Sequence, residues 1–427
     1  MRIAVVAEPL DRAAARCPAV ADAHRWFDWR TEAANMTVAV PGYDRAPRSP
    51  VDDRALDLLD LAVGVYAADI AVRRGERESW PRAITLTMPV RDPDFWRETE
   101  PTLAQLLYTL THDSLRLDFY PAPEDLTGPR DGAWAGLDIR PDCVSMLSGG
   151  LDSLAGAVML LSTGRRVAFT MHRSGNPLVR AAQEASIAAL ERHWPGAGVT
   201  YAATVTPEPR GRRAHPLPPP EQREPSRRAR SLLFMALAAL TARGADVGAV
   251  FMCENGLLNT GLPLSPARAG SMSTQSTHPV ALARFNDIAA RIGLGLHLSN
   301  PFVYQTKGEL VRDLLAPHLT PREIQSTVSC WALGRYPRPC GGCLPCLIRR
   351  LAMAWADLPE EAHMIDLLGE PRSYVGTTAW GNLVDLLRHA RQLQEMGDAE
   401  VLGANPGLLL LPSAGLSLPD VIAMLRR

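Results

Sequence analysis

The sequence predicts an α/β protein whose central domain contains a parallel β-sheet. From about residue 142, short apolar runs alternate with segments of helical periodicity, the pattern of a parallel sheet covered on both faces. The first apolar run ends in a pair of glycines before an apolar helix, and four cysteines gather between residues 330 and 346. These observations predict a phosphate-binding domain that carries one metal-binding loop.

Residues 1–138 are expected to form a separate N-terminal α+β domain. Apolar alternation and helical spacing in this part predict the strands 3–7, 37–40 and 84–90 and the helices 53–73 and 102–113. We find no set of residues here whose pattern points to a particular chemistry.

Residues 139–360 are expected to form the central domain, and residues 361–427 a helical extension. The expected strands are 143–147, 166–171, 199–205 and 247–253, and the expected helices are 151–162, 181–193, 230–243, 347–358 and 383–396. Ligands of parallel sheets bind beyond the carboxyl ends of the strands, so functional residues are expected at that edge.

Composition limits the partners of the protein. The formal charge is -1 over 427 residues, so no global attraction to nucleic acid or to a membrane is implied. No stretch approaches the roughly 20 apolar residues of a membrane span, and an acidic residue comes too early for a secretory signal. Seven cysteines, an odd number with four clustered, indicate a reducing compartment. We expect a cytoplasmic protein, and the oligomeric state stays open, a homodimer included.

The motif Ser148-Gly149-Gly150-Leu151-Asp152-Ser153 lies between a predicted strand and a predicted helix. The glycines allow a tight bend, so that successive N–H groups and the helix N-terminus face one concavity that suits phosphate. The two serines can donate hydroxyl hydrogen bonds, and Asp152 can hold Mg²⁺ or fix the loop. The motif lacks the lysine of a Walker A loop. The alternative is a tight turn capped by serine.

Cys330, Cys340, Cys343 and Cys346 follow the pattern Cys-x9-Cys-x2-Cys-x2-Cys. Cys-x2-Cys spacing lets two thiolates reach one ion, and four thiolates without a water position are typical of structural Zn²⁺. An iron–sulfur cluster or unligated thiols are the alternatives.

The glycine motif resembles the signature Ser-Gly-Gly-x-Asp-Ser of the PP-loop ATP pyrophosphatases, a superfamily with the adenine nucleotide alpha hydrolase-like, Rossmann-like fold. This resemblance implies cleavage of ATP between the α- and β-phosphates, with an adenylated substrate as the product. The loop would then stabilise the charge that gathers on the departing pyrophosphate.

The glycine motif and the cysteine run together resemble the 7-cyano-7-deazaguanine synthases, the QueC family, over about residues 142–356. Three further segments match that family in order: the segment that begins at Arg230, Cys253-Glu254, and Thr306-Lys307-Gly308-Glu309. The resemblance implies ATP-dependent activation of 7-carboxy-7-deazaguanine, attack of ammonia on the acyl adenylate, and a second activation that yields a nitrile.

The resemblance also implies roles for single residues. The glycine loop, with Asp152 and Ser153, would bind pyrophosphate. Arg230 and Lys307 would neutralise phosphate or carboxylate charge, and Glu254 would orient the base or the nucleotide. The alternative for these three residues is a solvated or structural charge.

Two segments depart from the QueC pattern. Residues 171–176 replace the family's Asp-Tyr-Gly-Gln, and residues 261–265 match its Gly-Tyr-Pro-Asp-Cys only in part. The N-terminal domain is also additional. The long form resembles the QueC-like proteins of anti-phage gene clusters, of the QatC and type IV CBASS kind, which implies transfer of the deazaguanine acyl group to an amine of a partner protein.

Two other functional classes also stay open for this sequence. The arginine-rich segment 207–230 could meet phosphates, as in a PP-loop enzyme that modifies tRNA. A zinc-stabilised binding protein without catalysis is the other.

Overall fold

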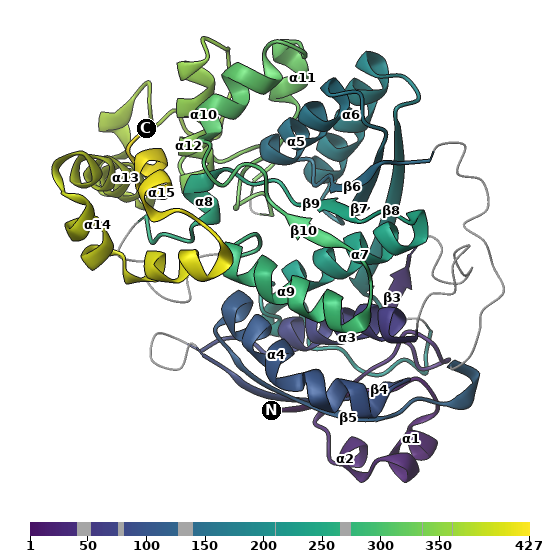
Figure 1. Ribbon diagram of the computed structural model, residues 1–427. Helices are drawn as coiled ribbons and strands as arrows, with labels where there is room; N and C mark the ends of the chain where they lie inside the picture. The colour runs from purple at the N-terminus through teal and green to yellow at the C-terminus, as the bar shows by residue number, and fades with distance from the viewer. Residues whose placement is uncertain are drawn as a thin grey trace.

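The computed structural model describes residues 1–40, 53–75, 81–126, 140–209, 211–264, 275–334, 336–360 and 362–427. The expected boundary between residues 138 and 139 lies outside these ranges. The described elements form stacked layers, in which two sheets are separated by two layers of helices (Figure 1).

The central sheet has six strands in the order β10-β9-β6-β7-β8-β3. Their bounds are β3 Met36–Ala39, β6 Cys143–Met146, β7 Val167–His172, β8 Gly198–Pro207, β9 Ala249–Phe251 and β10 His297–Ser299. The first five strands of this order are parallel, and β3 pairs antiparallel with β8. The predicted α/β class with a parallel sheet is therefore confirmed.

Helices cover both faces of the central sheet. In Figure 1, α5 (Leu151–Ser162) and α6 (Pro177–His193) lie on one face, and α7 (Arg230–Ala245) and α9 (Pro279–Ile292) on the other. The strand β6 supplies both cores: the buried Val144 packs on the α7 side and the buried Cys143 on the α5 side. Because both faces are covered, the strands β6, β7 and β9 read as mostly apolar runs.

The N-terminal part has its own sheet of four parallel strands in the order β2-β1-β4-β5. These strands are β1 Arg2–Val5, β2 Arg25–Phe27, β4 Ala83–Val90 and β5 Ser114–Pro121. The short helices α1 (Leu10–Arg16) and α2 (Pro18–Ala21) pack on one face. The longer helices α3 (Asp53–Ala71) and α4 (Pro93–Thr111) lie between the two sheets (Figure 1).

The helix α3 is buried over its whole length from Ala55 to Ala71. It packs on β4 of one sheet and on α7 of the other layer, so it has no face toward solvent in this stretch. One continuous apolar cluster therefore reaches from the N-terminal sheet through α3 and α7 to the central sheet. The pairing of β3 with β8 joins the two parts a second time.

The C-terminal residues pack around the helix α12 (Leu344–Trp355) and form a third apolar cluster. Their helices are α13 Thr378–Glu395, α14 Asp398–Ala404 and α15 Leu418–Arg426. Shorter helices elsewhere are α8 Gly256–Asn259, α10 Lys307–Glu309 and α11 Pro321–Gln325, with a π-helix at Leu310–Leu315 and 3₁₀-helices at Glu124–Leu126, Pro220–Gln222, Pro371–Tyr374 and Pro406–Ala414. Among the described helices, none has the length and apolar character that a membrane crossing requires.

Several elements differ from those predicted. The helix predicted at 102–113 begins at Pro93, because Asp92 caps it by accepting from the Phe95 N–H group, and Pro101 is accommodated inside it. The strands β2, β5 and β10 and the helix α9 were not predicted. The strand predicted at 37–40 exists as β3, but it belongs to the central sheet and not to the N-terminal one.

Candidate functional site

The glycine motif forms a tight loop between β6 and α5, as predicted. The Ser148 N–H and hydroxyl groups both donate to Ser153 Oγ, at 3.2 and 3.1 Å. Ser153 Oγ in turn donates to the Gly150 carbonyl oxygen at 2.9 Å, and Ser148 Oγ accepts from the Gly150 N–H group. The two serines thus fold the loop around the start of α5, where the helix dipole favours an anion.

Gly149 adopts a conformation that requires glycine. Its φ is +83°, in the left-handed region that side chains disfavour. A Cβ atom at this position would also lie 3.0 Å from the backbone nitrogen of Gln183 in α6. The glycine therefore lets the phosphate loop approach α6 closely.

Asp152 and Lys307 form a buried ion pair beside this loop. Lys307 Nζ donates to Asp152 Oδ1 at 2.5 Å, and the two residues are only 5% and 8% exposed. The other carboxylate oxygen accepts from the side chain of Asn255 at 2.8 Å. Asp152 is in the first turn of α5 and Lys307 begins α10, so residues 155 positions apart meet at the loop.

Lys307 is the only lysine among the 427 residues, since every other Lys or Arg position holds arginine. A compact ammonium shifts its pKa and fits confined sites in ways that a planar guanidinium does not. A single lysine in a chain that otherwise uses arginine was a signal in the sequence that pointed to Lys307.

Glu254 follows β9 at the same edge of the sheet. Its carboxylate accepts a hydrogen bond from the Thr277 hydroxyl, and its backbone is held by the Asn300 side chain, which donates to the Glu254 carbonyl oxygen at 2.7 Å. Burial raises the pKa of Glu254 to about 7, and the Asp152 carboxylate raises it further, whereas Thr277 and Lys307 oppose this shift. Glu254 can therefore exchange a proton near neutral pH.

Asn255, Thr277 and Asn300 are residues of this site that the sequence analysis did not single out. Each follows or precedes an element at the carboxyl edge of the sheet, and each bonds to Asp152 or Glu254. Their position directly after β9 and β10 was the available signal for Asn255 and Asn300.

Arg230 packs on the Phe234 ring at the start of α7. It is the first residue of α7, and its guanidinium carbon is 5.4 Å from the centre of the Phe234 ring. The Phe234 ring also contacts His172, the last residue of β7, with 5.8 Å between ring centres. Burial lowers the pKa of His172, and the charge of Arg230 lowers it further. Arg230 therefore stands at the carboxyl end of β7, the strand next to β6.

The four cysteines converge, as their spacing predicts. The Sγ atoms of Cys330, Cys340, Cys343 and Cys346 all lie within 4.8 Å of one another. The pairs Cys330–Cys343 and Cys340–Cys346 are each 3.9 Å apart. Tetrahedral Zn–S bonds of about 2.3 Å place sulfur atoms about 3.8 Å apart, so this donor set fits Zn²⁺.

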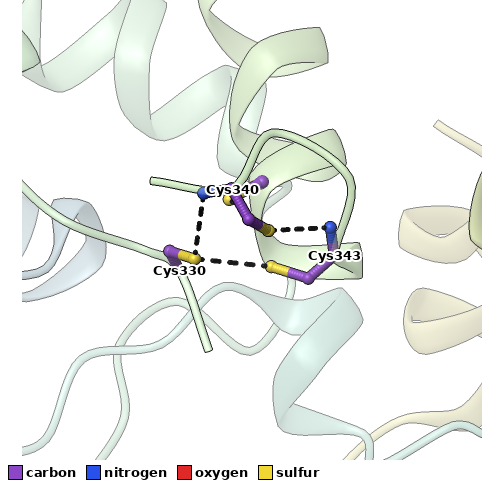
Figure 2. Close-up of side chains that lie close together, drawn as sticks. Cys330, Cys340 and Cys343 are labelled. Carbon is purple, nitrogen blue, oxygen red and sulfur yellow. Dashed lines mark hydrogen bonds between the residues drawn. The ribbon is translucent and has the colours of Figure 1, made fainter. Parts of the chain in front are cut away.

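Backbone N–H groups of the cysteine loop point at its sulfur atoms. Cys330 Sγ accepts from the N–H group of Cys340, and Cys340 Sγ accepts from that of Cys343, both at 3.3 Å (Figure 2). Such donors stabilise thiolates, the form that binds metal. Gly341, at a φ of +82°, makes the turn and packs against residues 363 and 365 of the C-terminal part.

The arginines of the segment 207–230 are divided between contacts with the protein and exposed positions. Arg228 is buried, Arg213 pairs with Glu32, and Arg223 donates to the Pro218 carbonyl oxygen. Arg210 lies outside the described residues. Arg212, Arg213, Arg227 and Arg230 are nevertheless exposed, so a PP-loop enzyme that modifies tRNA stays an open alternative.

The structure describes the first segment that departs from the QueC pattern in full and the second only in part. Residues 171–176 lead from β7 to α6, where Asn176 caps the helix by accepting from the Leu178 N–H group at 2.9 Å. The Gln183 side chain donates to the His172 carbonyl oxygen at 3.0 Å, so this connection lies beside the phosphate loop. Residues 261–264 follow α8, and Ser265 lies outside the described residues.

Comparison with known proteins gives relatives over about half of the chain. The chain is similar to the 7-cyano-7-deazaguanine synthase of Parasynechococcus marenigrum, with 31% identity over 232 residues that cover 51% of this chain and 94% of the relative. It is also similar to the 7-cyano-7-deazaguanine synthase of Synechococcus elongatus, with 28% identity over 241 residues that cover 52% and 94% of the two chains. No protein-family model and no solved structure matches the chain.

Proposed function

Because the chain belongs to the 7-cyano-7-deazaguanine synthase family, we propose that it uses ATP to adenylate the carboxylate of a 7-deazaguanine and releases pyrophosphate. The acyl adenylate then passes its acyl group to an amine, so that the enzyme is a ligase that forms a C–N bond. The observation that carries this proposal is the buried Asp152–Lys307 pair at the start of the phosphate loop helix.

The phosphate loop would hold the β- and γ-phosphates. Its N–H groups, the Ser148 and Ser153 hydroxyls and the N-terminus of α5 all favour negative charge. When the substrate carboxylate attacks the α-phosphorus, the bond to the β-phosphate oxygen breaks and charge moves onto pyrophosphate. Lys307, already beside the loop, would stabilise that charge in a site of low exposure.

Asp152 has two tasks in this proposal. In the structure its two oxygens accept from Lys307 and Asn255, which fixes the first turn of α5 against α10. Mg²⁺ bound with the triphosphate would neutralise phosphate charge, and Asp152, a carboxylate of the loop motif itself, could hold it. Zn²⁺ on the four cysteines would be structural, because four thiolates leave no open position.

Glu254 would act on the second half of the reaction. An attacking amine must lose a proton as the C–N bond forms and the bond to AMP breaks. A carboxylate with a pKa of about 7 can accept that proton near neutral pH. Arg230, at the end of β7, would bind the phosphate of the adenylate or the carboxylate before activation.

We infer that the acceptor amine belongs to a partner protein, in an anti-phage defence system. The support is the additional N-terminal part and the altered connection 171–176, which lies beside the phosphate loop. The alternative acceptor is ammonia, with formation of a free nitrile as in an ordinary synthase.

The test is mass spectrometry of the purified protein with ATP, Mg²⁺ and 7-carboxy-7-deazaguanine, with and without ammonia. AMP and pyrophosphate that depend on the deazaguanine, and that vanish in Asp152→Ala, would support the ligase. A nitrile would identify ammonia as the acceptor, whereas an adenylate without further product would point to another amine. No AMP under any condition would contradict the proposal. A different substrate class would then be favoured, with tRNA tested next.

A further inference from the structure

The N-terminal part reaches the first residues of α7 through one carboxylate. Asp69, near the end of α3, accepts a hydrogen bond from the Ala229 N–H group on its Oδ2 atom, at 2.9 Å. Ala229 is the residue that caps α7 and directly precedes Arg230. Asp69 and Ala229 are 3% and 1% exposed, so water cannot replace this contact.

Asp69 is itself held by a buried charge network. Its Oδ1 atom accepts from Arg82 at 2.5 Å, and Arg82 also pairs with Asp113 at 2.6 Å. Arg74 binds the same Asp113 carboxylate with two hydrogen bonds of 2.7 Å. All four side chains are less than 9% exposed. Such a network has one favoured geometry, because any displacement leaves a charge buried and unpaired.

The same network anchors the chain that leads into α7. The Glu224 side chain accepts from the Arg74 N–H group at 2.8 Å, and it also accepts from the Ser226 N–H group at 3.0 Å. The Glu224 N–H group donates to the Ile70 carbonyl oxygen, at the end of α3. The six residues before Arg230 are thus fixed at both ends to the N-terminal part.

A short path of contacts joins Arg230 to Glu254. Ser231 follows Arg230 in the first turn of α7, and its hydroxyl donates to Ser276 Oγ at 2.7 Å. Thr277, the next residue, donates to the Glu254 carboxylate. Placement of the α7 N-terminus by Asp69 therefore bears on two candidate residues of the site.

We propose that Asp69 is a positioning residue of the adenylation site, which acts by holding the start of α7 so that Arg230 faces the substrate. This inference rests on the proposed function. It assigns to the N-terminal part a share in catalysis that the match to the shorter relatives, which covers about half of this chain, does not account for.

The test is a double-mutant cycle of Asp69→Asn and Arg230→Ala. Asparagine keeps the size of the side chain but offers one acceptor oxygen in place of two, so it cannot satisfy both Arg82 and the Ala229 N–H group. We expect the single variant Asp69→Asn to lower kcat/KM for pyrophosphate release about tenfold, and the single variant Arg230→Ala to lower it more. The kcat/KM of the double variant should be no more than about twofold below that of Arg230→Ala, because Asp69 acts through Arg230.

Asp60→Asn is the matched control. Asp60 is a buried carboxylate of the same helix, and it pairs with Arg30 and Arg91 on the side of the N-terminal sheet. A general loss of stability would affect both aspartate variants, but only Asp69→Asn should be non-additive with Arg230→Ala. Additive effects of Asp69→Asn, or equal coupling of Asp60→Asn, would overturn the inference.

A second measurement separates this inference from the proposed function. Hydrogen exchange of the wild-type protein and of Asp69→Asn reports on the amides of residues 229–232 without any reaction. We expect exchange of the Ala229 amide to be at least about tenfold faster in Asp69→Asn and unchanged in Asp60→Asn. Unchanged exchange at Ala229 would overturn the inference, whether or not the protein is active. A wild-type protein that forms no AMP would overturn the proposed function, and with it the role of Asp69 in adenylation, but not the placement of the α7 N-terminus by Asp69.

Discussion

The Val328 N–H group donates a hydrogen bond of 3.0 Å to the carbonyl oxygen of Gly149. Val328 lies two residues before Cys330, the first cysteine of the cluster, and Gly149 is the glycine that bends the phosphate loop. The cysteine cluster therefore supports the phosphate loop from outside, through a single short segment of backbone.

Metal removal should accordingly weaken nucleotide binding. Without an ion the four thiolates repel one another, and the segment that holds Gly149 loses its anchor. Loss of this one hydrogen bond is worth about 1 kcal/mol, or roughly a fivefold increase in the Kd for ATP. Calorimetric titration of the chelator-treated protein and of Cys343→Ser measures this change. Cys17→Ser, an isolated cysteine outside the cluster, is the control, and unchanged ATP binding by the metal-free protein would contradict the expectation.

Substitution of Gly149 by alanine should abolish ATP binding. The new Cβ would meet the Gln183 backbone at 3.0 Å, so the loop must move away from α6. Gly164→Ala is the control, because Gly164 has a similar φ of +79° but no atom within 4 Å of the added Cβ. Both variants should lose about 1 kcal/mol of stability from the backbone strain, yet only Gly149→Ala should lose nucleotide affinity. Equal ATP affinity of the two variants would show that the loop tolerates displacement.

Lys307→Arg is expected to behave as a severe substitution. A guanidinium is larger and planar, and the ammonium it replaces is 5% exposed against Asp152. We expect kcat to fall by at least about a hundredfold. Lys307→Ala should also destabilise the protein by about 3 kcal/mol, because it leaves the Asp152 charge buried without its partner. Thermal unfolding and AMP release test the two effects, and Arg427→Lys, in an exposed pair with Glu309, should change neither.

The raised pKa of Glu254 predicts that both activity and stability depend on pH in the neutral range. Its pKa is raised to about 7 in the folded protein, so activity that needs the carboxylate should rise as the pH increases through about 7. Stability should change in the opposite direction. The unfolded state ionises this group from about pH 4.5 upward, so the stability present below that pH declines until the pH passes 7. In Glu254→Gln the stability curve should lose this decline and the rate should lose its rise, and a persistent rise would assign the titration to another group.

Removal of residues 1–138 should prevent folding of the remainder. The deletion takes away β3, which pairs with β8, and α3, which covers α7. The exposed faces are apolar, so we expect an aggregated product. Size-exclusion chromatography of the expressed fragment tests this, and a soluble, monodisperse fragment would mean that the two parts fold independently.

The central domain was largely predictable from the sequence. The strands β6 to β9 are apolar runs bounded by turns, and the glycine and cysteine motifs carry their own chemistry at short spacing. Even there β10 was not predicted, because it has one buried apolar residue, Leu298, between His297 and Ser299 and so forms no apolar run. The helix α9 has a strong apolar face, and the sequence analysis overlooked it.

The sequence did not predict which distant segments of the chain contact one another. The strand at Met36–Ala39 was predicted, but its polar and half-buried residues do not say which sheet it joins. The Asp152–Lys307 contact links residues 155 positions apart, and a single sequence does not show which residues so far apart in the chain meet in the fold. The helix α3 looked amphipathic, whereas its full burial comes from packing between two sheets.

The burial of the only lysine has a consequence for the reactivity of the protein toward the acyl adenylate of the proposed reaction. An acyl adenylate acylates any accessible, uncharged amine, and lysine side chains are the usual amines on a protein surface. Here the one ε-amine is an ammonium bonded to Asp152, and arginine occupies every other such position. Under the proposed function the enzyme can hold an activated acyl group without acylating lysine amines of its own, which keeps that group for the acceptor amine.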